Sequence, residues 1–266
     1  MAQSELTYVY LTGASGFLGQ HLKKTLPKKY RLIKITRKCT KLKYKIKKPN
    51  AILVHLGENS STKKCEKRFR LQKKYLKYLN INQFRKVIYA SSYYVYKPQS
   101  RLKIKEVGKT NKLFEYALSK IKTEILIQKH QNYIILRFSN ILGLNMKKST
   151  AIAEIIKAHK NGETAKLQNP NITRDFLWID DAISALWKAI KSGKNGIYNI
   201  GSGFGVNLKK LQQYLATKKA HQDSSNISLD YFCKNRLVLN IQKGFHDLLW
   251  APKTSFFQSL HKLGVI

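Results

Sequence analysis

The chain has 266 residues, with 51 Lys and Arg against 14 Asp and Glu, so its formal net charge is +37. This length fits one large α/β domain or two small ones, and Cys39, Cys65 and Cys233 lack the spacing of a disulfide framework or a zinc site, so no metal is expected. The N-terminus lacks a basic, apolar leader, and no apolar run approaches about eighteen residues. We therefore expect a cytoplasmic protein without a transmembrane segment.

The positive charge is spread along the whole chain and is not held in one tail. Such a field attracts nucleic acid, anionic lipid or anionic small substrates. Proteins that read nucleic acid favour Arg for forked contacts, whereas only nine of the 51 basic residues here are Arg. We therefore favour a compositional origin for the charge, and expect no specific nucleic-acid partner and at most a weak attraction to anionic membranes.

Strand-like and helical patterns alternate along the chain. Apolar runs typical of strands occupy residues 6–13, 30–36, 51–57, 86–92, 133–139 and 196–201. Helical spacing appears at 17–26 and is clearest at 180–190, while the polar stretch 220–228 indicates an exposed loop. Near-continuous apolar strands separated by helices predict an α/β fold with a doubly wound parallel sheet covered on both faces.

The first strand runs into the glycine-rich turn TGASGFLG. Gly13, Gly16 and Gly19 lie three residues apart, where glycine permits a tight turn and a close backbone approach to a pyrophosphate. The N-terminus of the next helix offers free N–H groups and a positive dipole end to that anion. We therefore expect a dinucleotide here, with Phe17 and Leu18 at the helix start also in the cofactor site.

The second strand ends in the residues ITRK. An acid at this place suits the ribose hydroxyls of NAD, whereas a basic side chain suits the 2′-phosphate of NADP. Arg37 and Lys38 therefore predict NADP as the cofactor, with NAD as the alternative.

Five Tyr-x-x-x-Lys pairs occur in the chain, so this spacing alone identifies no site. Tyr116 and Lys120 stand out because they begin a helix between the fourth and fifth apolar runs. In a helix this spacing puts the phenol and the ammonium on one face. A neighbouring ammonium favours a phenolate and lowers the pKa of a tyrosine, which can then exchange a proton with a substrate oxygen.

Taken in order, these motifs resemble the extended short-chain dehydrogenase/reductase family, of the NAD-dependent epimerase/dehydratase type. The resemblance runs nearly end to end, through the glycine turn, AILVHLG, VIYASSYYVY, YALSK, LRFSNILG, RDFLWIDD, YNIGSG and LLWAPKTSFFQSL. It implies a Rossmann-type domain from residues 1–140 plus about 173–202. It also implies a small substrate-binding lobe from about 141–172 plus 203–266.

The resemblance implies that Ser92, Tyr116 and Lys120 form a catalytic triad. Tyr116 would be the acid and base, Lys120 would tune it and bind the nicotinamide ribose, and Ser92 would hold the substrate oxygen. Asn140 and Arg174 match positions that contact the diphosphate part of a sugar nucleotide, for which a guanidinium is suited.

Two segments depart from the family pattern. Only about fourteen residues separate Thr36 from Ala51, where the family usually fits a helix, a strand and another helix, so this edge of the sheet is expected to be trimmed. At the end of the 51–57 strand, Leu56 is assigned to the cofactor site. His-Leu-Gly-Glu replaces the usual His-Leu-Ala-Ala there, which places Glu58 near the cofactor.

Tyr93 and Tyr94 follow Ser92, where sugar 4,6-dehydratases of the family carry an Asp-Glu pair, so a dehydratase is not expected. We expect an NAD(P)-dependent oxidoreductase of a nucleotide-linked sugar, as an NADPH-dependent 4-ketoreductase in surface-polysaccharide synthesis. A nucleotide-sugar epimerase that retains NAD is the alternative. A non-catalytic NADP-sensing protein or a nucleic-acid-binding protein stays open as a different class. The resemblance also implies a homodimer.

Overall fold

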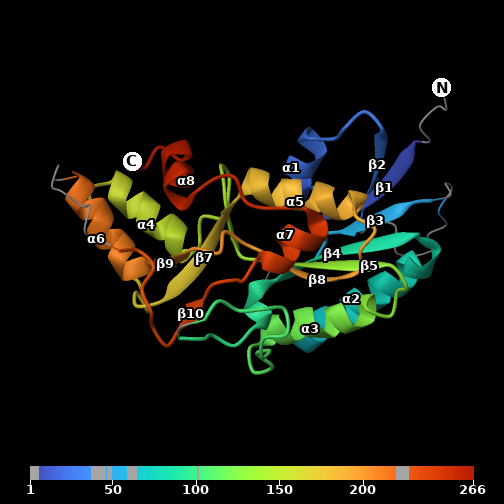
Figure 1. The fold of residues 1–266 in the computed structure, drawn as a ribbon, viewed down its shortest axis with the longest axis horizontal. Coiled ribbons are helices and arrows are strands. Elements are labelled where there is room, and N and C mark those ends of the chain that lie inside the picture. Colours follow the sequence, from blue (N-terminus) through green and yellow to red (C-terminus); the bar gives the residue numbers. More distant parts are fainter. Residues whose placement is uncertain (1–5, 37–45, 47–49, 59–64, 101, 220–227) are drawn as a thin grey trace.

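The computed structural model describes residues 6–36, 46, 50–58, 65–100, 102–219 and 228–266. Its larger sheet has six parallel strands in the order β2-β1-β3-β4-β5-β8 (Figure 1). These strands are β1 (Thr7–Thr12), β2 (Tyr30–Ile35), β3 (Ile52–His55), β4 (Lys86–Ser92), β5 (Tyr133–Phe138) and β8 (Gly196–Ile200). Each lies in one of the six apolar runs, so the predicted parallel sheet is confirmed.

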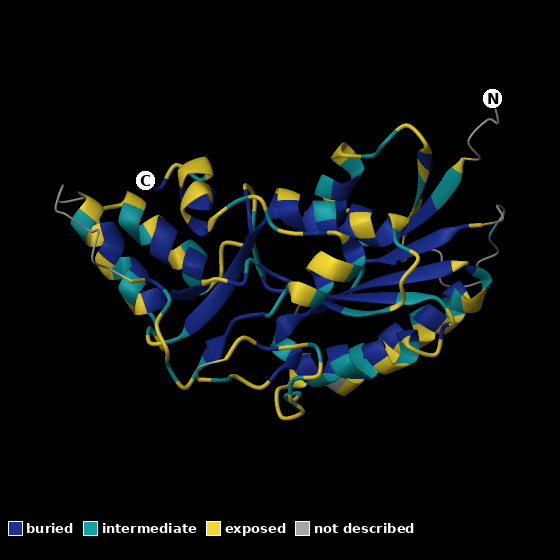
Figure 2. Ribbon diagram, in the orientation of Figure 1, coloured by how far each residue is buried: buried dark blue, intermediate teal, exposed yellow. Residues whose placement is uncertain are grey.

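The central strands are buried on both faces, which explains their continuous apolar character (Figure 2). Alternate residues point to opposite faces of a strand. Val9, Leu11 and Val54 accordingly belong to one hydrophobic cluster, whereas Tyr10 and Leu53 belong to another on the opposite side. The sheet therefore separates two cores, and both need helices to cover them.

Helices cover both faces of this sheet (Figure 1). One face carries α1 (Phe17–Lys24) and α5 (Ile179–Lys191), which pack against each other. The other carries α2 (Cys65–Leu79) and α3 (Glu115–Ile127), with the short 3-10 helices η2 (Ile81–Gln83) and η3 (Tyr93–Val95) at the ends of α2 and β4. This arrangement is the predicted doubly wound α/β fold. Among the described residues, no helix is long and apolar enough to cross a bilayer.

A smaller sheet lies beside the larger one and has β7 (Thr173–Trp178) at its centre. Strand β7 pairs with β6 (Asn140–Leu142), β9 (Gly205–Asn207) and β10 (Arg236–Leu237). The remaining helices are α4 (Ala151–Lys160), α6 (Leu208–Lys219), α7 (Gln242–Leu248) and α8 (Phe256–Lys262). The segment 173–202 is thus shared: β7 pairs in the small sheet, whereas β8 pairs in the large one. The division into two domains stays a prediction.

Helix α3 is tied to the large sheet by a buried ion pair. Arg137 on β5 places Nη2 2.6 Å from Glu124 Oε2 and Nε 3.0 Å from Glu124 Oε1, and both side chains are buried. Ser91 on β4 donates a hydrogen bond to the same carboxylate, and Arg137 Nη1 also donates to the Tyr96 hydroxyl at 2.8 Å. Arg137 thus has a structural role, since it ties β5 to α3 and to Tyr96.

This pair predicts a large loss of stability on removal of one partner. Glu124→Gln leaves a buried guanidinium without its counter-charge, which typically costs about 3–5 kcal/mol. We expect a loss of that order in the free energy of unfolding, measured by urea denaturation. Glu66→Gln is the matched control, because Glu66 pairs with Lys122 of the same helix at an exposed position and should change little. Equal effects of the two variants would contradict the assignment.

Candidate active site

The structure brings the predicted triad together at the carboxyl end of β4. Ser92 ends that strand, and η3 follows it directly. The ring of Tyr94 in η3 meets the ring of Tyr116 edge-on, with 6.4 Å between the centroids. Lys120 lies one turn further along α3, with Nζ 5.9 Å from the centroid of the Tyr116 ring. Tyr116 is half-buried and Lys120 is buried, so the phenol is the more accessible of the two.

A carboxylate from a different strand meets Lys120. Glu58 follows β3, and its Oε2 lies 2.7 Å from Lys120 Nζ, with both side chains less than a tenth exposed. Lys120 Nζ also donates to the Ala90 carbonyl at 2.9 Å, while Tyr89 on β4 donates its hydroxyl proton to Glu58. Lys120 is thus fixed against β3 and β4 by two acceptors.

Burial and pairing act in opposite directions on these two groups. Burial disfavours the Glu58 carboxylate, but the Lys120 ammonium beside it holds the pKa of Glu58 below its ordinary value. Burial likewise disfavours the ammonium, but Glu58 raises the pKa of Lys120 above its ordinary value. Burial and the same carboxylate raise the pKa of Tyr89. Glu58 and Lys120 are therefore both ionised at neutral pH.

The glycine-rich turn at residues 13–19 has the geometry of a phosphate-binding site, which we call the cofactor seat. Gly13 has a φ of +70°, and the N–H of Gly16 bonds to the Gly13 carbonyl at 3.0 Å. A Cβ on Gly19 would lie 2.2 Å from the Gly13 oxygen, so a side chain there would fill the turn. Helix α1 follows with no acid in its first turn, so its N-terminal N–H groups meet no repelling charge that would compete with a bound anion. These residues fit a dinucleotide diphosphate.

The end of β3 packs against this turn. A Cβ on Gly13 would lie 2.7 Å from Gly57 Cα, and the Gly57 N–H donates to Thr12 Oγ1 at 3.0 Å. The side chains of Phe17, Leu18 and Leu56 are half-buried and pack against the hydrophobic core. Phe17 and Leu18 begin α1 directly after the turn, and the carbonyl carbon of Leu56 would lie 2.7 Å from a Cβ on Gly13. All three predicted cofactor residues therefore adjoin the turn.

The predicted specificity residues Arg37 and Lys38 lie outside the described residues, as does most of the edge expected to be trimmed. The described part of the sheet ends at β2 on that side. The choice between NADP and NAD therefore stays a prediction.

The two predicted diphosphate residues lie on the small sheet, where β6 pairs with β7. Asn140 Nδ2 donates to the Tyr93 hydroxyl at 2.6 Å. Arg174 Nη1 donates to the Asn235 carbonyl at 2.8 Å and Nη2 to Asn235 Oδ1 at 3.0 Å. Both terminal nitrogens of the Arg174 guanidinium, Nη1 and Nη2, are thus already bonded to Asn235. Among the three guanidinium nitrogens of Arg174, Nε is buried and has no hydrogen-bond partner within the described part of the chain.

Sequence reasoning did not identify Asn235 as the partner of Arg174 or Lys120 as the partner of Glu58. Asn235 lies in an irregular segment, before β10, that carries no motif of its own. Glu58 gave a signal, as an acid in place of a small apolar residue, but its partner is 62 positions away along the chain. Only the folded arrangement reveals such contacts.

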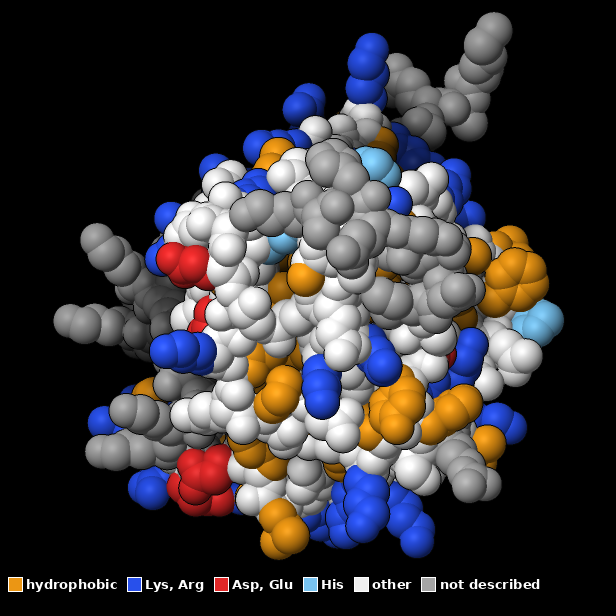
Figure 3. Space-filling view, turned by 90° about the vertical axis from the view of Figure 1, so that its left-hand side faces the viewer, with side chains coloured by type: hydrophobic (Ala, Val, Ile, Leu, Met, Phe, Trp, Pro, Cys, Tyr) orange, Lys and Arg blue, Asp and Glu red, His pale blue; other side chains and the backbone are white. Residues whose placement is uncertain are grey.

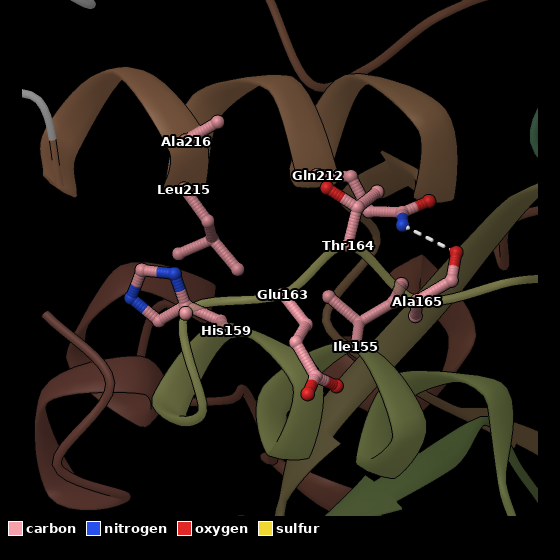
Figure 4. A pocket seen from close by; sticks show the side chains of 9 residues that line it. Ile155, His159, Glu163, Thr164, Ala165, Gln212, Leu215 and Ala216 are labelled. Carbon is pink, nitrogen blue, oxygen red and sulfur yellow. Dashed lines mark hydrogen bonds between the residues drawn. The ribbon is translucent and has the colours of Figure 1, made fainter.

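A cavity of about 380 Å³ lies in the small lobe, between α4, the segment after it and α6 (Figure 4). Its wall includes Ile155, His159, Glu163 and Leu215, and Gln212 donates to the Ala165 carbonyl at 2.8 Å beside it. None of the predicted site residues lines this cavity. Among the described residues, no cluster of His, Cys, Asp and Glu fits a metal ion.

Comparison with known proteins gives a family match over more than half of the chain. The model of the NAD dependent epimerase/dehydratase family matches residues 51–201 of 266. CDP-abequose synthase of Salmonella muenchen is 31% identical over 109 residues, which are 40% of this chain and 37% of that protein. dTDP-D-glucose 4,6-dehydratase of Homo sapiens is 25% identical over 191 residues, which are 66% of this chain and 55% of that protein.

A third relative matches over a longer stretch. dTDP-4-dehydro-6-deoxyglucose reductase of Escherichia coli is 26% identical over 225 residues, which are 79% of this chain and 70% of that protein. The matched part of the chain thus spans 37% and 55% of the length of the first two relatives, and 70% of the length of the third.

Solved structures share the fold over nearly the whole chain. RMD from Pseudomonas aeruginosa complexed with NADPH has a TM-score of 0.75 at 21% identity, covering 96% of this chain and 97% of that one. UDP-glucuronic acid 4-epimerase from Bacillus cereus, with UDP-glucuronic acid and NAD, has a TM-score of 0.75 at 19% identity with the same coverage. The family expected from the motifs is confirmed, and the chain belongs to the NAD dependent epimerase/dehydratase family.

Proposed function

We propose that this chain is an NADPH-dependent 4-ketoreductase of a nucleotide-linked sugar that acts in surface-polysaccharide synthesis. The observation that carries the proposal is the meeting of Tyr116 and Lys120 with the end of β4, close to the glycine turn. Gly57 packs on that turn while the next residue, Glu58, touches Lys120. Cofactor seat and proton donor thus share the carboxyl edge of one parallel sheet, where such folds bind ligands.

The residues of the chain supply the proton and the orientation. NADPH, when bound, supplies a hydride to the keto carbon. Tyr116 donates its hydroxyl proton to the carbonyl oxygen, which becomes the hydroxyl of the product. Ser92 Oγ accepts a hydrogen bond from the Tyr94 N–H at 3.3 Å and keeps its own proton for the same substrate oxygen. Lys120 lies beside the phenol and binds the nicotinamide ribose.

Two observations support a reductase over a dehydratase. At the positions where a dehydratase needs an acid pair, Tyr93 is buried and bonded to Asn140, and Tyr94 packs against Tyr116. Neither phenol replaces a carboxylic acid in the elimination of water at neutral pH. Of the three relatives, the reductase also aligns with the largest share of this chain.

The nucleotide part of the substrate is assigned to Asn140 and Arg174 on the small sheet. Binding a diphosphate there requires Arg174 to exchange its bonds to Asn235 for bonds to the ligand, or to use its unpartnered Nε. NADP, the homodimer and the cytoplasmic location stay predictions, which Arg37, Lys38 and the family resemblance support. NAD is the alternative cofactor.

On the one face that Figure 3 shows, the described basic residues do not form a track for nucleic acid. On the face at the α6 end, Lys and Arg side chains are scattered among polar and hydrophobic groups and do not form one continuous groove (Figure 3). A nucleic-acid reader concentrates its basic residues along a track that follows the phosphates. If the chain bound nucleic acid and NADPH did not change that affinity, a nucleic-acid-binding protein would be favoured over the enzyme.

Tyr116→Phe is the direct test of the reaction. The variant keeps the ring and removes the proton, so we expect turnover of nucleotide-linked 4-keto sugars with NADPH to fall by about 100- to 10,000-fold. Cofactor affinity should not change. The assay is a panel of such ketones and of nucleotide sugars, with product stereochemistry read by nuclear magnetic resonance.

Tyr214→Phe is the matched control, because Tyr214 and Lys218 have the same spacing in α6, far from the triad in the fold. It should keep full turnover. Full activity of Tyr116→Phe would refute the mechanism. Interconversion of a nucleotide sugar with its C4 epimer, without added cofactor, would instead favour the epimerase.

Gly19→Ala tests the cofactor seat. Its Cβ would lie 2.2 Å from the Gly13 oxygen and 2.8 Å from Ala14 Cα, so the turn has to open. We expect the Kd for NADPH to rise by about tenfold or more, a change of about 1.4 kcal/mol or more in binding free energy, measured by calorimetric titration. Gly193→Ala is the control, because a Cβ there meets nothing within 4 Å. Unchanged affinity in folded Gly19→Ala protein would exclude the turn as the seat.

A further inference from the structure

We propose that Glu58 is a positioning residue of the reaction, which acts through Lys120 to keep Tyr116 in its proton-donating form. The inference rests on the proposed role of Tyr116 as the acid. It concerns a carboxylate that lies outside the triad and stands where the family pattern has a small apolar residue.

The geometry makes Glu58 the nearest counter-charge of Lys120. Glu58 Oε2 is 2.7 Å from Lys120 Nζ, and Glu58 Oε1 is 3.4 Å from the Ser119 hydroxyl that donates to it. The Glu58 N–H bonds to the Leu56 carbonyl at 3.0 Å, and Tyr89 donates to the carboxylate from β4. Glu58 is thus bonded through its backbone and both carboxylate oxygens.

The other titratable groups around this pair are already engaged. From β3, the two ring nitrogens of His55 contact Thr12 and Gln72, and from β4 Tyr89 lies with its ring 4.9 Å from Lys120 Nζ. One turn along α3, Glu124 is neutralised by Arg137. From η3, Tyr94 presents a neutral ring to Tyr116. Glu58 is therefore the carboxylate, among the described residues, that pairs with Lys120.

The effect on Tyr116 follows from charge. A lone ammonium 5.9 Å from the phenol ring stabilises the phenolate. A carboxylate paired with that ammonium cancels most of its field and adds a repulsion of its own. The ion pair as a whole therefore attracts the phenolate less than a lone ammonium would. Since reduction of a ketone consumes the proton of the phenol, the ion pair favours the donor state over the base state of Tyr116.

The test is an ultraviolet difference titration of the phenol in Glu58→Gln protein. Each spectrum is taken against the same protein carrying Tyr116→Phe, so that the signal belongs to one of the 15 tyrosines. We expect the midpoint of phenolate formation to fall by about one pH unit or more on loss of the carboxylate charge. Glu58→Ala, which leaves room for water beside Lys120, provides a second charge-free variant if the Gln variant does not fold.

Two controls separate this effect from a structural one. Glu58→Asp keeps the charge and should leave the midpoint close to that of wild type. Glu66→Gln removes the carboxylate on α2 that pairs with Lys122 of α3 at an exposed position, and should not move the midpoint. A midpoint that is unchanged or raised in folded Glu58→Gln or Glu58→Ala protein would overturn the proposal.

The titration needs no substrate, so its result is separate from the proposed function. Failure of every nucleotide sugar in the panel would refute the ketoreductase while leaving the shift intact. Where turnover is found, the decline of ketone reduction at high pH should begin at lower pH in Glu58→Gln, by the same interval as the titration. A merely structural role of Glu58 would lower the rate at every pH without that displacement.

Discussion

The ion pair between Arg137 and Glu124 is the contact on which the site depends. It joins the last turn of α3 to β5 inside the protein, with donors and acceptors matched on both sides. Tyr116 and Lys120 lie on the same helix, about two turns and one turn before Glu124, respectively. The helix can neither rotate nor slide without breaking this pair. The distance from the phenol to the end of β4 is therefore set by a contact that takes no part in the chemistry.

A second constraint concerns where the scarce acids lie. The chain has only 14 Asp and Glu, yet the side chains of Glu58, Glu124, Asp175 and Asp181 are all buried. Asp175 accepts hydrogen bonds from the N–H groups of Ser202, Gly203 and Leu239, which offset burial, the main cause of the raised pKa of its carboxyl. Among the described residues, five basic side chains are buried as well, those of Lys86, Lys120, Arg137, Arg174 and Arg236, so the inward carboxylates leave the excess of basic residues on the outer surface almost unchanged.

The fold could be predicted from the sequence because its signals are local. Each apolar run became a strand, and the pattern at 180–190 became α5, since burial on both faces of a sheet requires uninterrupted apolar residues. The order of elements distinguished Tyr116 and Lys120 from the other four pairs, and the structure has both on α3 beside the end of β4, whereas their catalytic role stays a prediction. Contacts between distant polar side chains carry no such pattern. Hence Arg174 held by Asn235, and Lys120 held by Glu58, became visible only in the folded chain.

Strand β7 ends at Trp178 and helix α5 begins at Ile179, so no residue separates the small sheet from the large domain at this point. The C-terminal segment reinforces the junction, because the carboxylate of Asp181 accepts the N–H groups of Lys253 and Thr254. A direct junction of this kind leaves no linker residue about which the small sheet could rotate relative to the large one. The two sheets are held at one spacing, so under the proposed function the distance between the proposed nucleotide site on the small sheet and the Tyr116 phenol selects substrates by their length.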